Sequence, residues 1–255
     1  IMKNQSENKV YTLAEVLGKH TIAELKQMTQ VLEVKVLSKA KKQEIIDALS
    51  AKLLDKELLT AWLLAAGKQE IEELELAMAE DVVIAEESGR FYYWRNLPVV
   101  FVTGDGVVVV PSETAAVYNE IKSDSEYAAK RARIDVMDEY LMSCVNLYRA
   151  IDITTFLSIL NGQTGMNAKR PELESWLKDR EAVRGQQMYF FEGGYILSEE
   201  YRTKKEGEVV DYHQLLERQG AMSYYIPAKS ELLRYADHIV FNSPSQLLRF
   251  GLMAK

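Results

Sequence analysis

Cysteine and histidine are scarce in this sequence, and no apolar run is long enough to cross a bilayer. The single cysteine, Cys144, excludes an intrachain disulfide, and its apolar surroundings VMDEYLMSCVNLYRA predict a buried, unreactive thiol. The three histidines are isolated in the sequence and too few for a histidine-based metal site. The longest apolar stretch, 97–111, is broken by a turn signal, whereas a membrane helix needs about 20 apolar residues. We therefore expect no metal and no membrane partner.

Catalytic motifs are missing as well. The glycine-containing segment TGDGV at 103–107 lacks the lysine of a phosphate loop and any following helix start, and no nucleophile elbow or dinucleotide fingerprint is present. The Glu-rich segment 70–75 has no histidine at metal-site spacing, which predicts a solvated helix face. We expect a protein without enzymatic activity or cofactor; an enzyme whose site is dispersed over helices is a third-ranked alternative. The polar segment 1–9 has no signal-peptide pattern, so we expect a cytoplasmic location.

Charge is distributed unevenly along the chain, which has a net charge of −7. Residues 1–55 contain nine Lys and seven acidic residues, whereas residues 56–90 contain three basic and nine acidic residues. An acidic body repels a polyanion and limits non-specific binding. Any contact with nucleic acid should therefore lie in the N-terminal segment.

The segment 21–54 predicts two short amphipathic helices joined by an extended, lysine-bearing loop. Their apolar faces carry Ile22, Leu25, Met28 and Leu32 in the first helix and Ile45, Ile46, Leu49, Leu53 and Leu54 in the second. Helices this short are stable in water only if such faces meet, so Leu25, Leu32, Ile46 and Leu49 should form a small core. The loop between them is then the part presented to a partner.

Helix starts in this region have recognisable caps. Thr12 with Glu15, and Thr21 with Glu24, have the spacing of capping boxes. Ser38 is a polar cap candidate for the helix after the loop, with Lys41 or Lys42 as alternative starts.

Two turn signals predict β-hairpins in a body that is otherwise mainly helical. Asp105-Gly106, flanked by β-branched residues, predicts a type I′ turn, and Gly193-Gly194 lies between two aromatic-rich strands. Further along, Pro111 should end a strand, Ser112 and Asp152 should cap helices, and Pro171 should open one. A loop is expected at 161–170 and helices from about residue 211 onward; 91–100 is either a short helix or a strand.

The predicted fold class is mainly α (α+β): an N-terminal helix–extended loop–helix module at 1–55, a helical segment with the first hairpin at 56–125, and a helical domain with the second hairpin and C-terminal helices at 126–255. Three helices followed by a two-stranded wing is the order of a winged helix, although many plain α+β domains share it. The hairpin tips TGDG and EGG are acidic, which favours protein contact or a structural role over phosphate contact. The basic cluster KRAR at 130–133 spreads around a helix and predicts a solvated face.

The stretch VLEVKVLSKAKKQEIIDAL resembles the helix–extended loop–helix modules of the SAP and Rho termination factor N-terminal type. The matching features are the apolar helix TIAELKQMTQVL, the β-like VKV, a small polar residue before lysines, and KKQEIIDAL at the second helix; the glycine usual in the loop is absent. The resemblance implies that the loop and the start of the second helix approach nucleic-acid backbone. Carried over by position, it implies contacts by Lys39, Lys41 and Lys42, with Lys35 and Ser38 nearby.

The C-terminal run from Ser223 to Leu252 resembles the tails of uncharacterised bacterial or phage proteins, a resemblance that implies no chemistry. The leading hypothesis is a non-enzymatic bacterial or phage protein with a regulatory role, associated with DNA or RNA through its N-terminal lysines. The alternative is a protein-interaction or scaffold protein whose surface is the acidic body and the hairpins.

Overall fold

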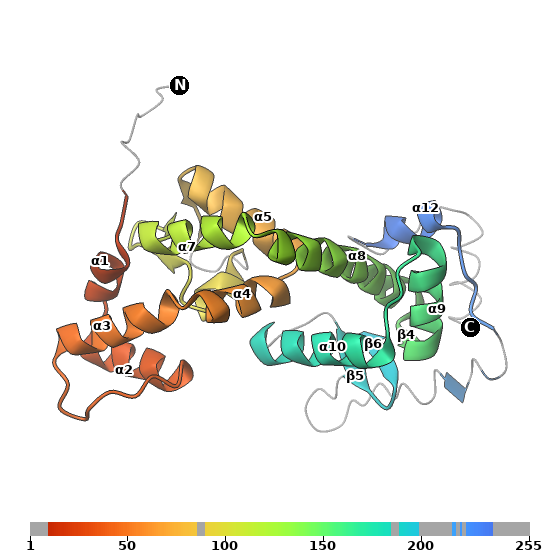
Figure 1. Cartoon of the computed structure of the whole chain (residues 1–255), viewed down its shortest axis with the longest axis horizontal. Coiled ribbons are helices and arrows are strands. Elements are labelled where there is room, and N and C mark those ends of the chain that lie inside the picture. The colour runs from red at the N-terminus through yellow and green to blue at the C-terminus, as the bar shows by residue number, and fades with distance from the viewer. Residues whose placement is uncertain are drawn as a thin grey trace. The chain divides into compact units, whose positions relative to one another are not determined.

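A computed structural model of the chain describes residues 10–85, 90–184, 189–198, 216–217, 220 and 223–236. The chain divides into two compact units, Ile1–Ala132 and Arg133–Lys255, and each is described by itself. The fold is mainly helical with two small three-stranded antiparallel sheets, as the sequence predicts (Figure 1). No helix within the described ranges combines the length and apolar character required to cross a membrane.

Unit 1 contains the first seven helices and the first sheet. In chain order its elements are α1 (Leu13–Gly18), α2 (Ile22–Val31), α3 (Lys42–Leu53), α4 (Lys56–Ala65), α5 (Lys68–Ala79), β1 (Val82–Val83), α6 (Tyr92–Asn96), β2 (Phe101–Val102), β3 (Val107–Val109) and α7 (Ser112–Lys122). The long helix α8 (Ser125–Tyr148) crosses the boundary between the units.

Unit 2 continues with one strand, two helices and a hairpin. Its elements are β4 (Ala150–Asp152), α9 (Ile153–Thr164), α10 (Arg170–Arg184), β5 (Tyr189–Glu192), β6 (Tyr195–Ser198), α12 (Lys229–Leu232) and the 3-10 helix η2 (Leu233–Tyr235). The last two confirm helical structure at 229–235. Of the helix predicted at 211–219, only 216–217 are described and are helical, and the prediction beyond 236 lies outside the described residues.

The small core predicted for the N-terminal module is present. Leu25 and Leu49 are completely buried, and Leu32 and Ile46 are nearly so, which confirms the pairing of α2 with α3. Ile22, the first residue of α2, is 45% exposed, so its place in the predicted apolar face is wrong. Both capping boxes are confirmed.

The module packs on the rest of unit 1. The Ser112 N–H donates to the Tyr11 carbonyl at 2.9 Å, and the Leu13 N–H donates to Glu113 Oε2 at 2.9 Å. These bonds hold the start of α1 against the start of α7. Ser112 itself is the first helical residue of α7, and Pro111 occupies the cap position without a side-chain bond, so the prediction that Ser112 caps this helix is wrong.

The first predicted hairpin is confirmed, but its turn differs from the prediction. β3 lies between β1 and β2, and the register Phe101↔Val109 and Val102↔Val108 leaves five residues between the last paired residues. Only Gly106 has a positive φ, of 82°, so the loop is not a two-residue type I′ turn. A Cβ atom at position 106 would lie 2.7 Å from the Ile84 carbonyl oxygen, which is too close. Only glycine therefore fits at this position, next to the end of β1.

The second hairpin is the two-residue turn that the sequence predicts. Gly193 and Gly194 have φ values of 58° and 87°, and Glu192 pairs with Tyr195 across them. β6 lies between β4 and β5. The outer strands β1 and β4, with two and three residues, were not predicted because so few residues give no alternation signal.

The core of unit 2 is formed by α8, α9, α10 and the second sheet, with Leu141, Phe156, Leu173 and Ile196 completely buried. Asp152 caps α9 as predicted, accepting from the Thr155 N–H at 2.8 Å. α9 continues to Thr164 and ends at Gly165 with φ 72°, so the predicted loop at 161–170 is shorter than expected. The order of α8, α9, α10 and the hairpin β5–β6 is the predicted order of three helices and a wing; a winged-helix fold stays a prediction.

Candidate nucleic-acid interface

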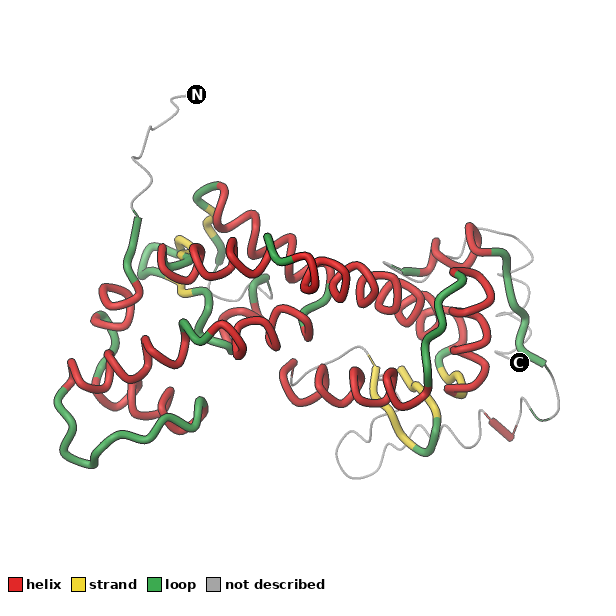
Figure 2. Tube along the Cα trace, viewed as in Figure 1, coloured by secondary structure: helices red, strands yellow, loops and turns green. Residues whose placement is uncertain are grey.

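The loop at residues 33–41, called the lysine loop below, joins α2 to α3 and forms no strand (Figure 2). Glu33 has a positive φ of 53° and turns the chain back at the end of α2. The Val34 N–H donates to the Thr29 carbonyl at 2.8 Å, and the Ala40 N–H donates to the Leu37 carbonyl at 3.0 Å. The first of these bonds joins the loop to α2, and the second closes a turn within the loop.

Two lysine side chains tie the module together. Lys26 Nζ, in the middle of α2, donates to the Ser38 carbonyl at 3.1 Å. Lys42 Nζ, at the start of α3, donates to the Gly18 carbonyl at 2.6 Å, just before α2. The first bond joins α2 to the lysine loop, the second joins α3 to the end of α1, and the loop runs back beside α2, as Figure 2 shows.

Side chains alternate along the lysine loop between exposed and half-buried. Lys35, Leu37, Lys39 and Lys41 are exposed, whereas Val34, Val36, Ala40 and Lys42 are half-buried. Within the described part of the chain, the ammonium groups of Lys35, Lys39 and Lys41 make no hydrogen bond or ion pair. Of the four lysines at which the sequence predicts contacts, three therefore have ammonium groups without a partner among the described residues, and Lys42 is hydrogen-bonded to the Gly18 carbonyl.

The start of α3 differs from the starts of α1 and α2. Lys41 is its N-cap residue, and an ammonium group has no acceptor to offer the first N–H groups of the helix. The Glu44 carboxylate accepts from the Lys41 N–H at 2.7 Å. Ser38 lies three residues before Lys41 and is exposed, so it does not cap α3 and that part of the prediction is wrong. The start of α3 therefore has a carboxylate from its first turn but no side-chain acceptor from its N-cap residue.

A pocket of about 290 Å³ lies on another face of α2. It is lined by His20, Glu24, Gln27, Met28, Val31, Leu32, Arg95, Asn96 and Pro98. Positions 24, 27, 28 and 31 recur at helical spacing and share one face, and Lys26, which contacts the lysine loop, lies on a different face. The pocket and the lysine loop are therefore separate surfaces of the module.

The second basic cluster, at 130–133, is engaged within the fold. Lys130 pairs with Glu126 one helical turn away at 2.6 Å. Arg131 is only 8% exposed and donates to the Leu63 and Ala66 carbonyls at 2.9 and 2.8 Å, which caps the C-terminal end of α4. The predicted solvated face is therefore wrong for Arg131. A helix end needs such donors because its last carbonyls lack partners within the helix.

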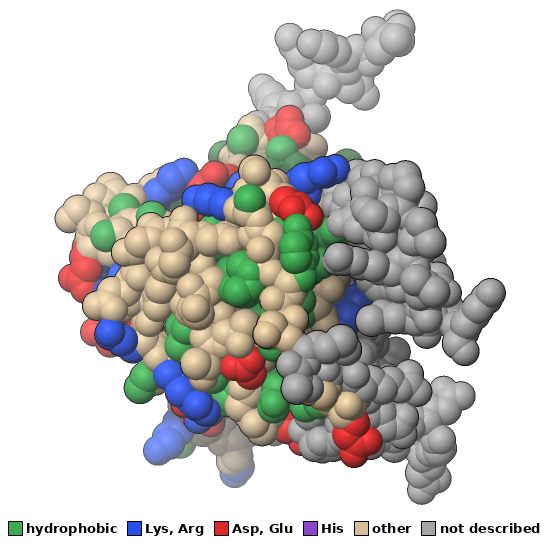
Figure 3. All heavy atoms as spheres, turned by 90° about the vertical axis from the view of Figure 1, so that its right-hand side faces the viewer, with side chains coloured by type: hydrophobic (Ala, Val, Ile, Leu, Met, Phe, Trp, Pro, Cys, Tyr) green, Lys and Arg blue, Asp and Glu red, His purple; other side chains and the backbone are tan. Residues whose placement is uncertain are grey.

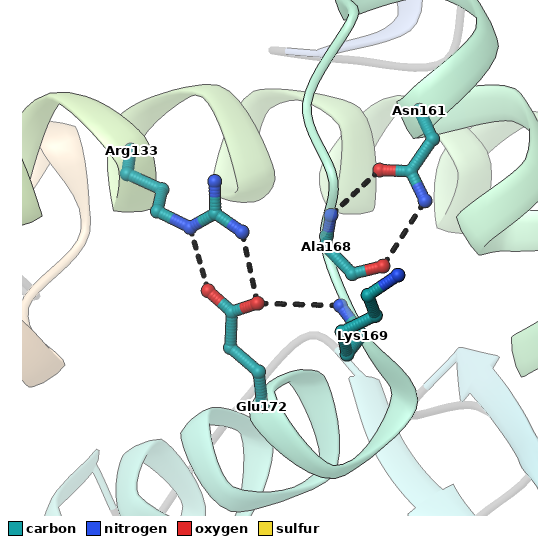
Figure 4. A network of polar contacts seen from close by, with 5 residues as sticks. All are labelled: Arg133, Asn161, Ala168, Lys169 and Glu172. Carbon is teal, nitrogen blue, oxygen red and sulfur yellow. Dashed lines mark hydrogen bonds and ion pairs between the residues drawn. The ribbon is translucent and has the colours of Figure 1, made fainter.

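Arg133 makes a two-point contact with Glu172 of α10 (Figure 4). Its Nε and Nη2 donate to the two carboxylate oxygens at 2.6 and 2.8 Å, and the Lys169 N–H adds a bond at 3.2 Å. The hydrogen bond from Arg133 holds the pKa of the Glu172 carboxyl below its usual value. Beside this pair, the Asn161 side chain brackets the backbone of Ala168 with two hydrogen bonds (Figure 4).

The Glu-rich helix α5 is also structural. Glu73 accepts from the Phe91 N–H at 2.9 Å, and Glu75 accepts from Tyr118 at 2.6 Å and pairs with Lys122. Burial raises the pKa of Glu75, but the bonds from Lys122 and Tyr118 outweigh it and leave the pKa below its usual value. The solvated face predicted for this segment is wrong for these two acids. No group of His, Cys, Asp and Glu suited to a metal ion occurs among the residues described.

Cys144 is completely buried, as predicted, and burial raises the pKa of its thiol to about 12.

On the face drawn in Figure 3, basic and acidic side chains are interspersed, which is typical of a solvated surface. Comparison with protein-family models, curated proteins and solved structures finds no match to this chain.

Sequence reasoning identified the lysine loop but missed two features of it. The exposed Leu37 lies between two lysines, and Lys26 and Lys42 act as tethers. The alternation of residue types from Val34 to Lys39 was a signal for Leu37, whereas the tethers join residues 12 and 24 positions apart and had no local signal.

Proposed function

We propose that this is a nucleic-acid-associated protein without catalytic activity, whose N-terminal module binds the sugar–phosphate backbone through the lysine loop. The observation that carries the proposal is the state of Lys35, Lys39 and Lys41. They are exposed on an anchored loop, and no carboxylate or carbonyl in the described part of unit 1 engages their ammonium groups. An ammonium group without a partner is available to neutralise a phosphate and release its counterion.

The start of α3 supports the same ligand. Backbone N–H groups at a helix N-terminus favour anions, and here the ammonium group of the N-cap residue Lys41 offers them no acceptor. Lys39 and Lys41 lie directly before this helix end. Two sources of positive potential therefore coincide at one point of the module, which suits a phosphate group.

The expected interaction is weak and independent of sequence. Lysines that contact phosphates fix position but read no bases. Three contacts predict a log–log salt slope of about −2 to −3 on duplex DNA. The acidic stretch at 56–90 keeps non-specific attraction low, so binding should require low salt. A role in regulation is part of the proposal, because a weak, position-fixing contact suits a protein that brings a second surface to nucleic acid.

The experiment is a salt titration with the full-length chain. Its binding to fluorescently labelled duplex and single-stranded DNA is followed by anisotropy as the salt concentration rises. The variant with Lys35, Lys39 and Lys41 changed to Ala should lose most of the affinity for unrelated sequences alike, and its salt slope should fall toward zero.

A matched control separates the loop from net charge. Changing the exposed residues Lys68, Lys178 and Lys229 to Ala removes the same charge without touching the lysine loop. This control should keep the wild-type slope. An equal loss in both triple variants would mean that overall charge, and not the loop, governs binding, and the proposal would be wrong.

The alternative is a protein-interaction or scaffold protein, and the pocket on α2 is the observation that favours it. Its lining combines apolar residues such as Met28, Leu32 and Pro98 with polar and charged ones such as Glu24 and Arg95. Apolar surface with a few polar groups is the usual make-up of a binding pocket. If the full-length chain binds neither DNA form at low salt, the nucleic-acid proposal fails and this alternative replaces it.

A further inference from the structure

Leu37 is 80% exposed, more than any other large apolar side chain in the part of the chain that the structure describes. It lies on the outward side of the lysine loop between Lys35 and Lys39. Single exposed apolar residues are common on protein surfaces and need no function. The position of Leu37 between two free lysines is what calls for an explanation.

The exposure of Leu37 is fixed by the loop and not a consequence of a loose chain. Its carbonyl accepts from the Ala40 N–H at 3.0 Å, and the next carbonyl, of Ser38, accepts from Lys26 Nζ at 3.1 Å. The half-buried Val34 and Val36 occupy the inward positions of the same segment. The loop therefore places its valines inward and holds the leucine out in water.

A leucine gains free energy by leaving water only if its partner offers an apolar surface. A phosphate backbone offers none, and in a duplex the flat faces of the bases are covered by their neighbours. Unpaired bases expose those faces: aromatic side chains stack on them without sequence preference, and an aliphatic side chain can bury apolar surface against them. The lysines contact phosphates in both forms and release more counterions per contact on a duplex, so a preference for the single strand would have to come from Leu37.

Resting on the proposed function, we propose that Leu37 packs against unpaired bases while Lys35 and Lys39 hold the backbone on either side, which makes single-stranded nucleic acid the preferred ligand of the lysine loop. The loop thus combines two kinds of contact. The lysines supply the salt-dependent part of the affinity, and Leu37 supplies a part that does not depend on salt.

The test compares wild type with Leu37→Ala in the full-length chain. The probes are a labelled DNA strand of about 20 nucleotides, long enough for a single site, and its duplex form. Leu37→Ala should lower the affinity for the single strand about tenfold at every salt concentration, with an unchanged salt slope. Its affinity for the duplex should stay within about twofold of wild type, so the preference for the single strand disappears.

Two controls accompany this variant. Leu37→Met keeps an apolar side chain of similar size and should bind like wild type. Val83→Ala truncates another exposed apolar residue, 66% exposed on β1, and should change neither affinity. Because Leu37 is exposed, thermal melting of Leu37→Ala should match that of wild type; if it does not, Leu37→Ser serves as the second variant.

The outcomes separate this proposal from the one on which it rests. If wild type binds DNA with the expected salt slope but Leu37→Ala leaves the single-strand affinity unchanged, the role of Leu37 is refuted and the lysine proposal survives. A loss of equal size on both DNA forms also refutes it, because Leu37 would then contact a feature that the duplex shares. If wild type binds neither form, both proposals fail, and Leu37 belongs to a surface for another class of partner.

Discussion

The lysines at 35, 39 and 41 and the basic cluster at 130–133 are similar in sequence and opposite in use. In the second cluster, Arg131 caps the C-terminal end of α4 and Arg133 binds the Glu172 carboxylate, so both guanidinium groups have partners within the fold. In the first, three ammonium groups face outward from an anchored loop, with no partner among the residues that the structure describes. The difference teaches that a cluster of positive charge indicates a ligand only when the fold leaves it unpaired.

The lysine loop is held by the packed core of α2 and α3. Removing a core side chain should therefore have the largest effect on the free energy of unfolding. Leu49 is completely buried in the core of the N-terminal module. Leu49→Ala should lower the free energy of unfolding by about 2–5 kcal/mol, because it leaves a cavity between α2 and α3. Denaturant unfolding measures this, with the exposed Leu37→Ala as the matched control. A change below about 0.5 kcal/mol would show that this core does not support the loop.

A smaller loss is expected when the second cluster loses its buried member. Arg131→Ala leaves the Leu63 and Ala66 carbonyls without this donor. The free energy of unfolding should fall by about 1–3 kcal/mol, the cost of leaving buried acceptors unpaired. Lys35→Ala in the same denaturant experiment is the control and should have no effect. If both variants lowered the free energy of unfolding equally, the two clusters would not differ in their contribution to stability, which would contradict this comparison.

The contact between Arg133 and Glu172 is partly exposed, so it should contribute less than about 1 kcal/mol. Because the pKa of Glu172 is lower in the folded chain than its ordinary value of 4.5, this contribution is present above about pH 4.5 and is lost as the pH falls through the lowered pKa. The difference in unfolding free energy between wild type and Glu172→Gln should therefore shrink from pH 7 to about pH 3. Glu126→Gln, at an exposed pair, is the control with a smaller difference. A difference that stays constant with pH would contradict the ion pair.

The smallest effect on stability should come from the lysine loop itself. Changing Lys35, Lys39 and Lys41 to Ala removes no contact within the described residues, so the free energy of unfolding should change by less than about 0.5 kcal/mol. Thermal melting at two salt concentrations checks this. Marked destabilisation would mean that the loop lysines serve the fold as the second cluster does.

Sequence patterns were reliable where the deciding interaction is local. The capping boxes at Thr12 and Thr21 join residues three positions apart, and the Gly193-Gly194 turn follows from the φ values that glycine permits. The first hairpin was also found, but its turn type was missed because β1 pairs with β3 and draws Gly106 close to Ile84. The short strands β1 and β4 were missed because their pairing partners lie far along the chain.

The sequence by itself determined the mainly helical fold class, the two hairpins, the buried pairing of α2 with α3 and the location of a lysine-rich loop between them. Only the tertiary structure decided which charges are free. Lys42 is bound to a carbonyl 24 residues away, Arg133 to a carboxylate 39 residues away and Arg131 to a carbonyl 68 residues away. Charge and helical period are carried by neighbouring residues, whereas the pairing of a charged side chain depends on the groups that folding brings to it.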